Sequence, residues 1–246
     1  MPDVLLAPAK LTRSLRITGV RDDGYHLIDA EMVSIDLCDR LTFTDGAGID
    51  VVGGGTDVPT DETNLVRRAL WAVGRTAHVR LEKRIPSGAG LGGGSSDAAA
   101  VLRWAECSDV SLAATLGADV PFCLRGGRAR VAGIGDALEP LPPLALTFTL
   151  LVPPLHCSTA EVYRAWDGLG GPTGHASGND LEPAAIAVEP RLAEWRARLA
   201  EATGRTPMLA GSGSTWFVEG DHPGEGRLVV RTTGPFDGPD AAPLRS

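Results

Sequence analysis

The sequence predicts an α+β protein of two domains, and three observations support this fold class. Stretches that alternate polar and apolar residues, as strands do, are interspersed with stretches of helical periodicity. A run of glycines at 88–94 lies between one such strand and one such helix. Pro140, Pro142 and Pro143 then interrupt the chain. A length of 246 residues suffices for two cores, so we expect an N-terminal domain over 1–144 and a C-terminal domain over 145–246.

Alternation and turn signals locate the elements of the first domain. Strands are predicted at 4–17, 32–43, 49–52, 78–83 and 125–138. A helix carrying an apolar face at 65–73 is expected to be capped by Asp61 or Thr63 and to end near Gly74. The triple glycine at 53–55 is expected to be a plain flexible turn. A second helix follows the glycine loop, since alanine, valine and leucine recur at helical spacing over 98–105.

The second domain shows the same mixture. A continuous apolar strand is predicted at 146–152, and Ser158-Thr159 begins a helix that includes Trp166. A loop at 168–178, a helix after 178–181 and an amphipathic helix over 190–199 follow. A glycine loop at 208–215 joins two further strands. From His222 the chain is rich in proline and glycine, and a loose tail is expected at its end.

Composition excludes several classes of function. The net charge of −8 argues against nucleic acid as a partner, because phosphate backbones need a basic face. No apolar run approaches 18 residues and the N-terminus lacks a basic signal region, so neither a membrane partner nor a signal peptide is expected. The four cysteines are far apart, which favours reduced thiols in a cytoplasmic protein. No histidine or cysteine spacing indicates a metal site.

The glycine-rich stretch at 85–100 has the properties of a phosphate-binding loop. Glycine allows positive φ and close approach of a ligand to backbone amides, and a helix N-terminus directly behind adds a favourable dipole. No lysine follows the glycines, so the Walker pattern is absent. Gly88, Gly90 and Gly93 formally satisfy the dinucleotide pattern, but the acidic second strand of that fold is missing. A surface turn without a ligand is the remaining alternative.

This loop resembles the nucleotide-binding motif of the GHMP kinases, which bind the triphosphate of ATP without a Walker lysine. The resemblance implies a two-domain GHMP kinase fold with the active site in the cleft between the domains, and ATP and Mg²⁺ as cofactors. It also implies the ATP-binding residues, which are Pro86, Gly88, Gly90, Leu91, Gly92, Gly93, Gly94, Ser95 and Ser96.

Further motifs are similar to the branch of this family that phosphorylates 4-diphosphocytidyl-2-C-methyl-D-erythritol. In Asp-Gly-Tyr-His, the resemblance implies that Tyr25 stacks on the cytosine and that His26 hydrogen-bonds to it. Pro-Ala-Lys at 8–10 matches as well, although Thr12 stands where the branch usually has asparagine. The remaining substrate-binding residues implied are Thr159, Gly211, Ser212 and Gly213.

Two residues are candidates for catalysis. From spacing alone, Lys10 is a lysine at a strand end and Asp119 a cap before Pro121. The resemblance instead implies that Asp119 is the base and that Lys10 stabilises charge in the active site. An aspartate paired with a lysine stays ionised at neutral pH and can accept the hydroxyl proton of a substrate.

The resemblance spans residues 4 to about 219 and implies a cytoplasmic kinase of the isoprenoid precursor pathway that does not use mevalonate. A monomer or weak homodimer is expected. Two alternatives remain, and Thr12 and the shortened segment at 107–116 are the features that leave them open. One is a GHMP kinase for another small alcohol, and the other is a catalytically silent nucleotide-binding paralogue. A Rossmann oxidoreductase is a distant third.

Overall fold

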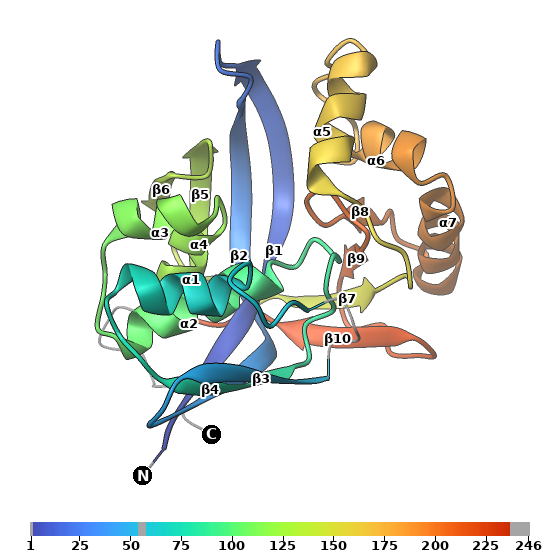
Figure 1. The fold of residues 1–246 in the computed structure, drawn as a ribbon. Helices are drawn as coiled ribbons and strands as arrows, with labels where there is room; N and C mark the ends of the chain where they lie inside the picture. Colours follow the sequence, from blue (N-terminus) through green and yellow to red (C-terminus); the bar gives the residue numbers. More distant parts are fainter. Residues whose placement is uncertain (1, 54–57, 237–246) are drawn as a thin grey trace.

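The first half of the chain is built on a six-stranded sheet. The computed structural model describes residues 2–53 and 58–236. The strands of this sheet are β1 (Asp3–Val20), β2 (His26–Thr44), β3 (Gly48–Gly53), β4 (His78–Lys83), β5 (Arg128–Gly133) and β6 (Ala137–Pro140). The long strand β2 pairs with β1 along one edge, and with β4 and β5 along the other. Figure 1 shows the β1–β2 hairpin rising between the two halves of the molecule.

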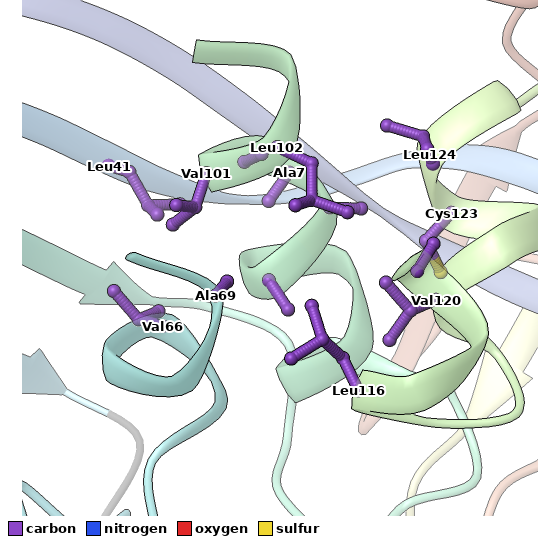
Figure 2. Packing of buried hydrophobic residues seen from close by; sticks show 14 of the residues in the cluster. Ala7, Leu41, Val66, Ala69, Val101, Leu102, Leu116, Val120, Cys123 and Leu124 are labelled. Atoms are coloured by element: carbon purple, nitrogen blue, oxygen red, sulfur yellow. The ribbon is translucent and has the colours of Figure 1, made fainter. Parts of the chain in front are cut away.

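Helices cover one face of this sheet. They are α1 (Leu65–Ala72), α2 (Gly93–Trp104), α3 (Val110–Leu116) and α4 (Val120–Arg125). Helix α2 lies at their centre, and its alanines, valine and leucine are accordingly buried by neighbours on several sides (Figure 2). Val101 and Leu102 are fully buried against residues of β1, β2 and the neighbouring helices. This packing fixes the start of α2, and with it the glycine loop, relative to the sheet.

The second half carries a smaller, four-stranded antiparallel sheet in the order β10-β7-β9-β8. Its strands are β7 (Thr147–Leu151), β8 (Met208–Leu209), β9 (Trp216–Glu219) and β10 (Arg227–Arg231), and its helices are α5 (Thr159–Gly168), α6 (Glu182–Val188) and α7 (Leu192–Thr203). Trp216 is fully buried between this sheet and the helices. No helix among the described residues is both long and apolar enough to cross a membrane.

The two halves are joined by a shared core and by β1. One buried cluster combines Leu11 and Ile35 of the first sheet with Phe148 and Phe217 of the second. Further along β1, Leu15 exchanges backbone hydrogen bonds with the segment that precedes α6. The α+β fold class is confirmed, with one sheet in each half of the chain. The boundary at 144/145 falls between β6 and β7 and stays a prediction.

Two local expectations differ from the structure, and a segment to which the sequence assigned no element contains a helix. Helix α1 is capped by Asn64, whose side chain accepts from Val66 N, whereas Asp61 caps the preceding turn at Thr63. The segment at 107–116 contains a short helix, α3, which Asp109 caps. The expected loose tail is wrong for 227–236, because β10 pairs with β7 and Phe236 N donates to Arg125 O. The rest of that tail, 237–246, and the glycine turn at 54–55 lie outside the described residues.

Candidate active site

A cavity of about 470 Å³ lies where the glycine loop, β1 and the start of β2 face α5 and the second glycine loop. Both halves of the chain therefore contribute to its wall. Most of the predicted site residues line it, namely Lys10, Thr12, His26, Pro86, Gly88, Gly90, Leu91, Gly92, Gly93, Gly94, Ser95, Asp119, Thr159, Gly211 and Ser212.

The glycine loop lines this cavity from Gly88 to Gly94. Gly88, Gly90 and Gly92 all have positive φ, a conformation that residues with a Cβ rarely adopt. Helix α2 begins directly afterwards at Gly93, and the residues of its first turn, Gly93 to Ser95, line the cavity. Because the first N–H groups of a helix have no partner within it, this end of α2 can bind an anion such as a phosphate.

Lys10 and Asp119 form an ion pair inside the cavity. The distance between Lys10 Nζ and an Asp119 carboxylate oxygen is 3.2 Å, and Lys10 Nζ also donates to Thr12 Oγ1 at 3.2 Å. The Lys10 side chain is 7% exposed and that of Asp119 is 32% exposed. Asp119 precedes α4 but makes no capping hydrogen bond. Because its carboxylate is partly exposed and caps no helix, Asp119 is available to a reacting group. It is the single carboxylate among the described residues that line the cavity.

The base of the glycine loop is held by a buried ion triad that sequence reasoning missed. Lys83, at the end of β4, donates to Asp39 of β2 and to Asp97 of α2, the latter at 2.7 Å. Asp39 also accepts from the backbone N–H groups of Arg84 and Ile85, which lead into the loop. The triad therefore fixes the loop from the strand side and from the helix side.

The charges of this triad are not balanced. Burial would lower the pKa of Lys83, but the carboxylates of Asp97 and Asp39 outweigh it and raise that pKa. Burial raises the pKa of Asp97 to about 8, and the nearby Asp39 adds to the effect. Lys83 and Asp97 also line a second cavity of about 170 Å³ beside the loop, together with the apolar Val58, Pro59 and Leu65.

One part of the main cavity is aromatic, where His26 and Tyr163 line it. The ring of His26 packs on Tyr163 of α5, with centroids 4.7 Å apart, and meets the edge of Trp166 at 5.4 Å. Burial, with the charge of Asp119 as a further cause, raises the pKa of Tyr163 to about 12, so its hydroxyl keeps its proton. Tyr163 lines the cavity and was not singled out from the sequence, where only its helical position was evident.

The second glycine loop completes the wall. Thr159, at the start of α5, shares a hydrogen bond of 2.9 Å with Ser212. Asn179 donates to the backbone oxygens of Leu209 and Gly211 and so ties this loop to the start of α6. Thr159, Gly211 and Ser212 of the second half therefore line the same cavity as the glycine loop of the first half.

Three expected site residues do not line the main cavity. Tyr25, at the tip of the β1–β2 hairpin, is 61% exposed. Ser96 is buried and its hydroxyl donates to Pro8 O, which attaches α2 to β1. Gly213 lies behind the first loop, where its carbonyl would meet a Cβ at Gly90. Within the described residues, no group of three or more His, Cys, Asp or Glu side chains is arranged to hold a metal ion.

Comparisons with known proteins agree on one family. Residues 64–127 match the GHMP kinases N terminal domain. A 4-diphosphocytidyl-2-C-methyl-D-erythritol kinase of Pelotomaculum thermopropionicum is 41% identical, over 86% of this chain and 87% of the relative. The enzyme of that name in Paracoccus denitrificans is 39% identical, over 86% and 84%.

Solved structures show the same relationship. A crystal structure of 4-(cytidine 5'-diphospho)-2C-methyl-D-erythritol kinase is similar with a TM-score of 0.75 and 33% identity, over 94% of this chain and 100% of that chain. A homoserine kinase from Cytophaga hutchinsonii has a TM-score of 0.59 at 20% identity, over 93% and 95%, and supports the fold alone.

Proposed function

The chain belongs to the 4-diphosphocytidyl-2-C-methyl-D-erythritol kinase family of GHMP kinases, and from this premise we propose how its cleft performs the reaction. The enzyme transfers a phosphoryl group from ATP to a hydroxyl of 4-diphosphocytidyl-2-C-methyl-D-erythritol, a step in isoprenoid precursor synthesis. The observation that carries our mechanism is the Lys10–Asp119 pair beside the glycine loop.

The triphosphate of ATP lies against the glycine loop and the first turn of α2. The backbone N–H groups of Gly90 to Ser95 donate to its phosphate oxygens, in place of the lysine that a Walker loop would supply. The second cavity, with its apolar wall of Val58, Pro59 and Leu65, has a size and character that suit the adenine. The ion triad of Asp39, Lys83 and Asp97 holds the loop in place.

The acceptor hydroxyl is deprotonated by Asp119. Its carboxylate takes the proton while the hydroxyl oxygen forms a bond to the γ-phosphorus, and the bond from that phosphorus to the β-phosphate oxygen breaks. Lys10 orients the Asp119 carboxylate through the ion pair and stabilises the charge that develops on the transferred group. ADP and the phosphorylated alcohol leave as products.

Mg²⁺ fits this cavity as an ion that enters with the triphosphate. Asp119 and the hydroxyl of Ser95 are oxygen donors on the wall near the loop, and magnesium keeps most of its coordination for phosphate and water. When bound, the ion neutralises charge on the phosphates.

The cytidine is bound at the aromatic part of the cavity. His26 and Tyr163 support this assignment, since an aromatic face stacks on a base and an imidazole bonds to its edge. Tyr25 remains a predicted stacking residue, because it directly precedes His26 and its ring is exposed. Thr159, Gly211 and Ser212 are proposed to bind the phosphates of the substrate. Free cysteines and the use of ATP favour a cytoplasmic enzyme. The expected monomer or weak homodimer stays a prediction.

The test combines the reaction with one variant. The protein, incubated with Mg-ATP and the cytidyl substrate, is expected to yield ADP and a monophosphorylated product, measured by mass spectrometry. Asp119→Ala is expected to lower turnover by about 10²–10⁴-fold, as for loss of a general base, while ATP affinity stays within about threefold. Retained turnover would remove Asp119 as the base. Binding of ATP without ADP formation would favour a silent paralogue, and transfer only to free small alcohols would favour another GHMP kinase.

A further inference from the structure

A carboxylate outside the cavity wall holds the ring of His26. The distance between His26 Nε2 and Asp167 Oδ1 is 2.8 Å. His26 begins β2 in the first half of the chain, whereas Asp167 lies near the end of α5 in the second. The His26 side chain is only 11% exposed, because Tyr163 covers one face and the edge of Trp166 meets it. The ring is therefore fixed in orientation.

This contact determines which nitrogen of His26 carries a proton. An ionised carboxylate can only accept a hydrogen bond, so Nε2 must donate. In the neutral imidazole the other nitrogen, Nδ1, then has a lone pair and acts as an acceptor. Among the residues that the structure describes, none makes a hydrogen bond to Nδ1. His26 lines the cavity, so this acceptor is left for a ligand.

We propose that Asp167 is a positioning residue that fixes His26 as an acceptor and thereby selects cytosine over uracil. This inference rests on the proposed function, in which His26 contacts the base. Cytosine carries an exocyclic amine that donates a hydrogen bond, and uracil carries a carbonyl oxygen at the same position. An acceptor on the protein pairs with the amine of cytosine, whereas it would face the uracil oxygen without a proton between them. Such a mismatch in a partly buried site excludes the wrong ligand effectively.

The variant Asp167→Asn tests this directly. Its amide can either accept from Nε2 or donate to it, so the ring is no longer held in one tautomer and His26 becomes a donor at Nδ1 in part of the molecules. Asp167 is about half exposed, so the substitution should leave the fold intact. Glu161→Gln is the matched control, since it removes the same charge from an exposed position on the same helix.

Two measurements compare the bases. The first is kcat/KM with the cytidyl substrate and with its uridyl analogue; the second is calorimetric binding of CDP and UDP, which needs no phosphoryl transfer. We expect the preference for cytosine to fall about tenfold or more in Asp167→Asn, through KM and Kd rather than kcat, and to be unchanged in Glu161→Gln. An equal loss for both bases would mean that Asp167 only holds α5, and would overturn the inference.

Nitrogen NMR of His26 separates this inference from the proposed function. The wild-type ring is expected to show a protonated Nε2 and an unprotonated Nδ1, and Asp167→Asn a shift towards protonated Nδ1. If the cytidyl substrate is not phosphorylated, the proposed function fails. The preference for CDP over UDP and the NMR signal of His26 still test whether Asp167 fixes the tautomer of His26. A protonated Nδ1 in the neutral wild-type ring, or equal binding of CDP and UDP, would overturn the assignment of Asp167.

Discussion

At the scale of single residues, the buried triad under the glycine loop holds more negative charge than positive. Two carboxylates, Asp39 and Asp97, share one ammonium group, that of Lys83. Asp39 is satisfied by two backbone N–H groups, whereas the second oxygen of Asp97 has no hydrogen-bond partner. The proton that relieves this imbalance therefore belongs on Asp97, whose pKa burial raises to about 8.

This shift predicts a pH-dependent stability. The folded protein binds a proton at Asp97 up to about pH 8, whereas the unfolded chain releases it near the ordinary value of 3.8. The folded state thus holds more protons between these values, and the free energy of unfolding falls as the pH rises, by at most about 1.4 kcal/mol per pH unit for one proton. In Asp97→Asn this slope should disappear. Urea unfolding of both proteins between pH 5 and 8 measures it, and parallel profiles would contradict the assignment.

The sequence contained half of this arrangement. Alternation along 78–83 places Lys83 on the same face as Val79 and Leu81, so a lysine on a buried strand face was visible. Its partners were not, because Asp39 lies 44 residues away in the chain and only the pairing of β2 with β4 brings it close. The residues of the glycine loop, in contrast, could be predicted from the sequence, because they are contiguous in the chain and are proposed to bind phosphate through their own backbone.

At the scale of elements, the glycine loop and β1 are fitted to each other. A Cβ at Gly92 would lie 2.7 Å from Lys10 Cγ, and Gly92 already has φ of +69°. Lys10 N donates to Leu91 O, so the strand also holds the loop through the backbone. The close approach that Gly92 permits is thus what brings Lys10 beside the helix start.

Gly92→Ala should therefore impair catalysis beyond its effect on stability. The added methyl displaces the Lys10 side chain from Asp119, and we expect turnover to fall by about 10²-fold or more, comparable with the loss of one electrostatic contact in a transition state. Gly74→Ala is the control, since Gly74 has φ of +63° with nothing within 4 Å of a Cβ. Both variants should lose about 1 kcal/mol of stability from the left-handed backbone. Equal turnover in the two variants would refute the steric argument.

The type of most helices and strands could be predicted from the sequence, whereas the residues at which they begin and end were predicted less well. Alternation and helical spacing predicted the strands and helices that form the site, including the strand–loop–helix over 78–104. The cap of α1 was placed too early, because Asp61 and Thr63 are themselves good caps and instead stabilise the preceding turn. Strand β10 was missed because proline and glycine dominate its surroundings, while its strand conformation is stabilised by pairing with β7.

At the scale of the whole molecule, Asp180 connects the two halves beside the active site. It is buried and accepts from Ile17 N of β1, from His175 N and from the guanidinium of Arg16 at 2.8 Å. Burial alone would raise the pKa of Asp180, but these donors outweigh it and lower that pKa. Its contribution to stability is therefore complete at neutral pH and is lost as the pH falls below the usual range of an aspartate. No sequence pattern predicts a contact between residues so far apart.

Asp180→Ala should loosen the second half against the first. Two backbone N–H groups and Arg16 lose their acceptor, which we expect to cost about 2–4 kcal/mol of unfolding free energy. Since Asp180 lies just before α6, hydrogen exchange should increase most in α6, in β8 and in β1 around Ile17, while β3 and β4 remain protected. Asp29→Ala is the control, because it removes an exposed pair with Arg130 within the first sheet.

Asp180→Ala should also weaken substrate binding, measured as KM, because His26 and Lys10 belong to the first half and Tyr163 and Thr159 to the second. A uniform rise in exchange across both sheets would show that Asp180 stabilises the molecule without coupling its halves.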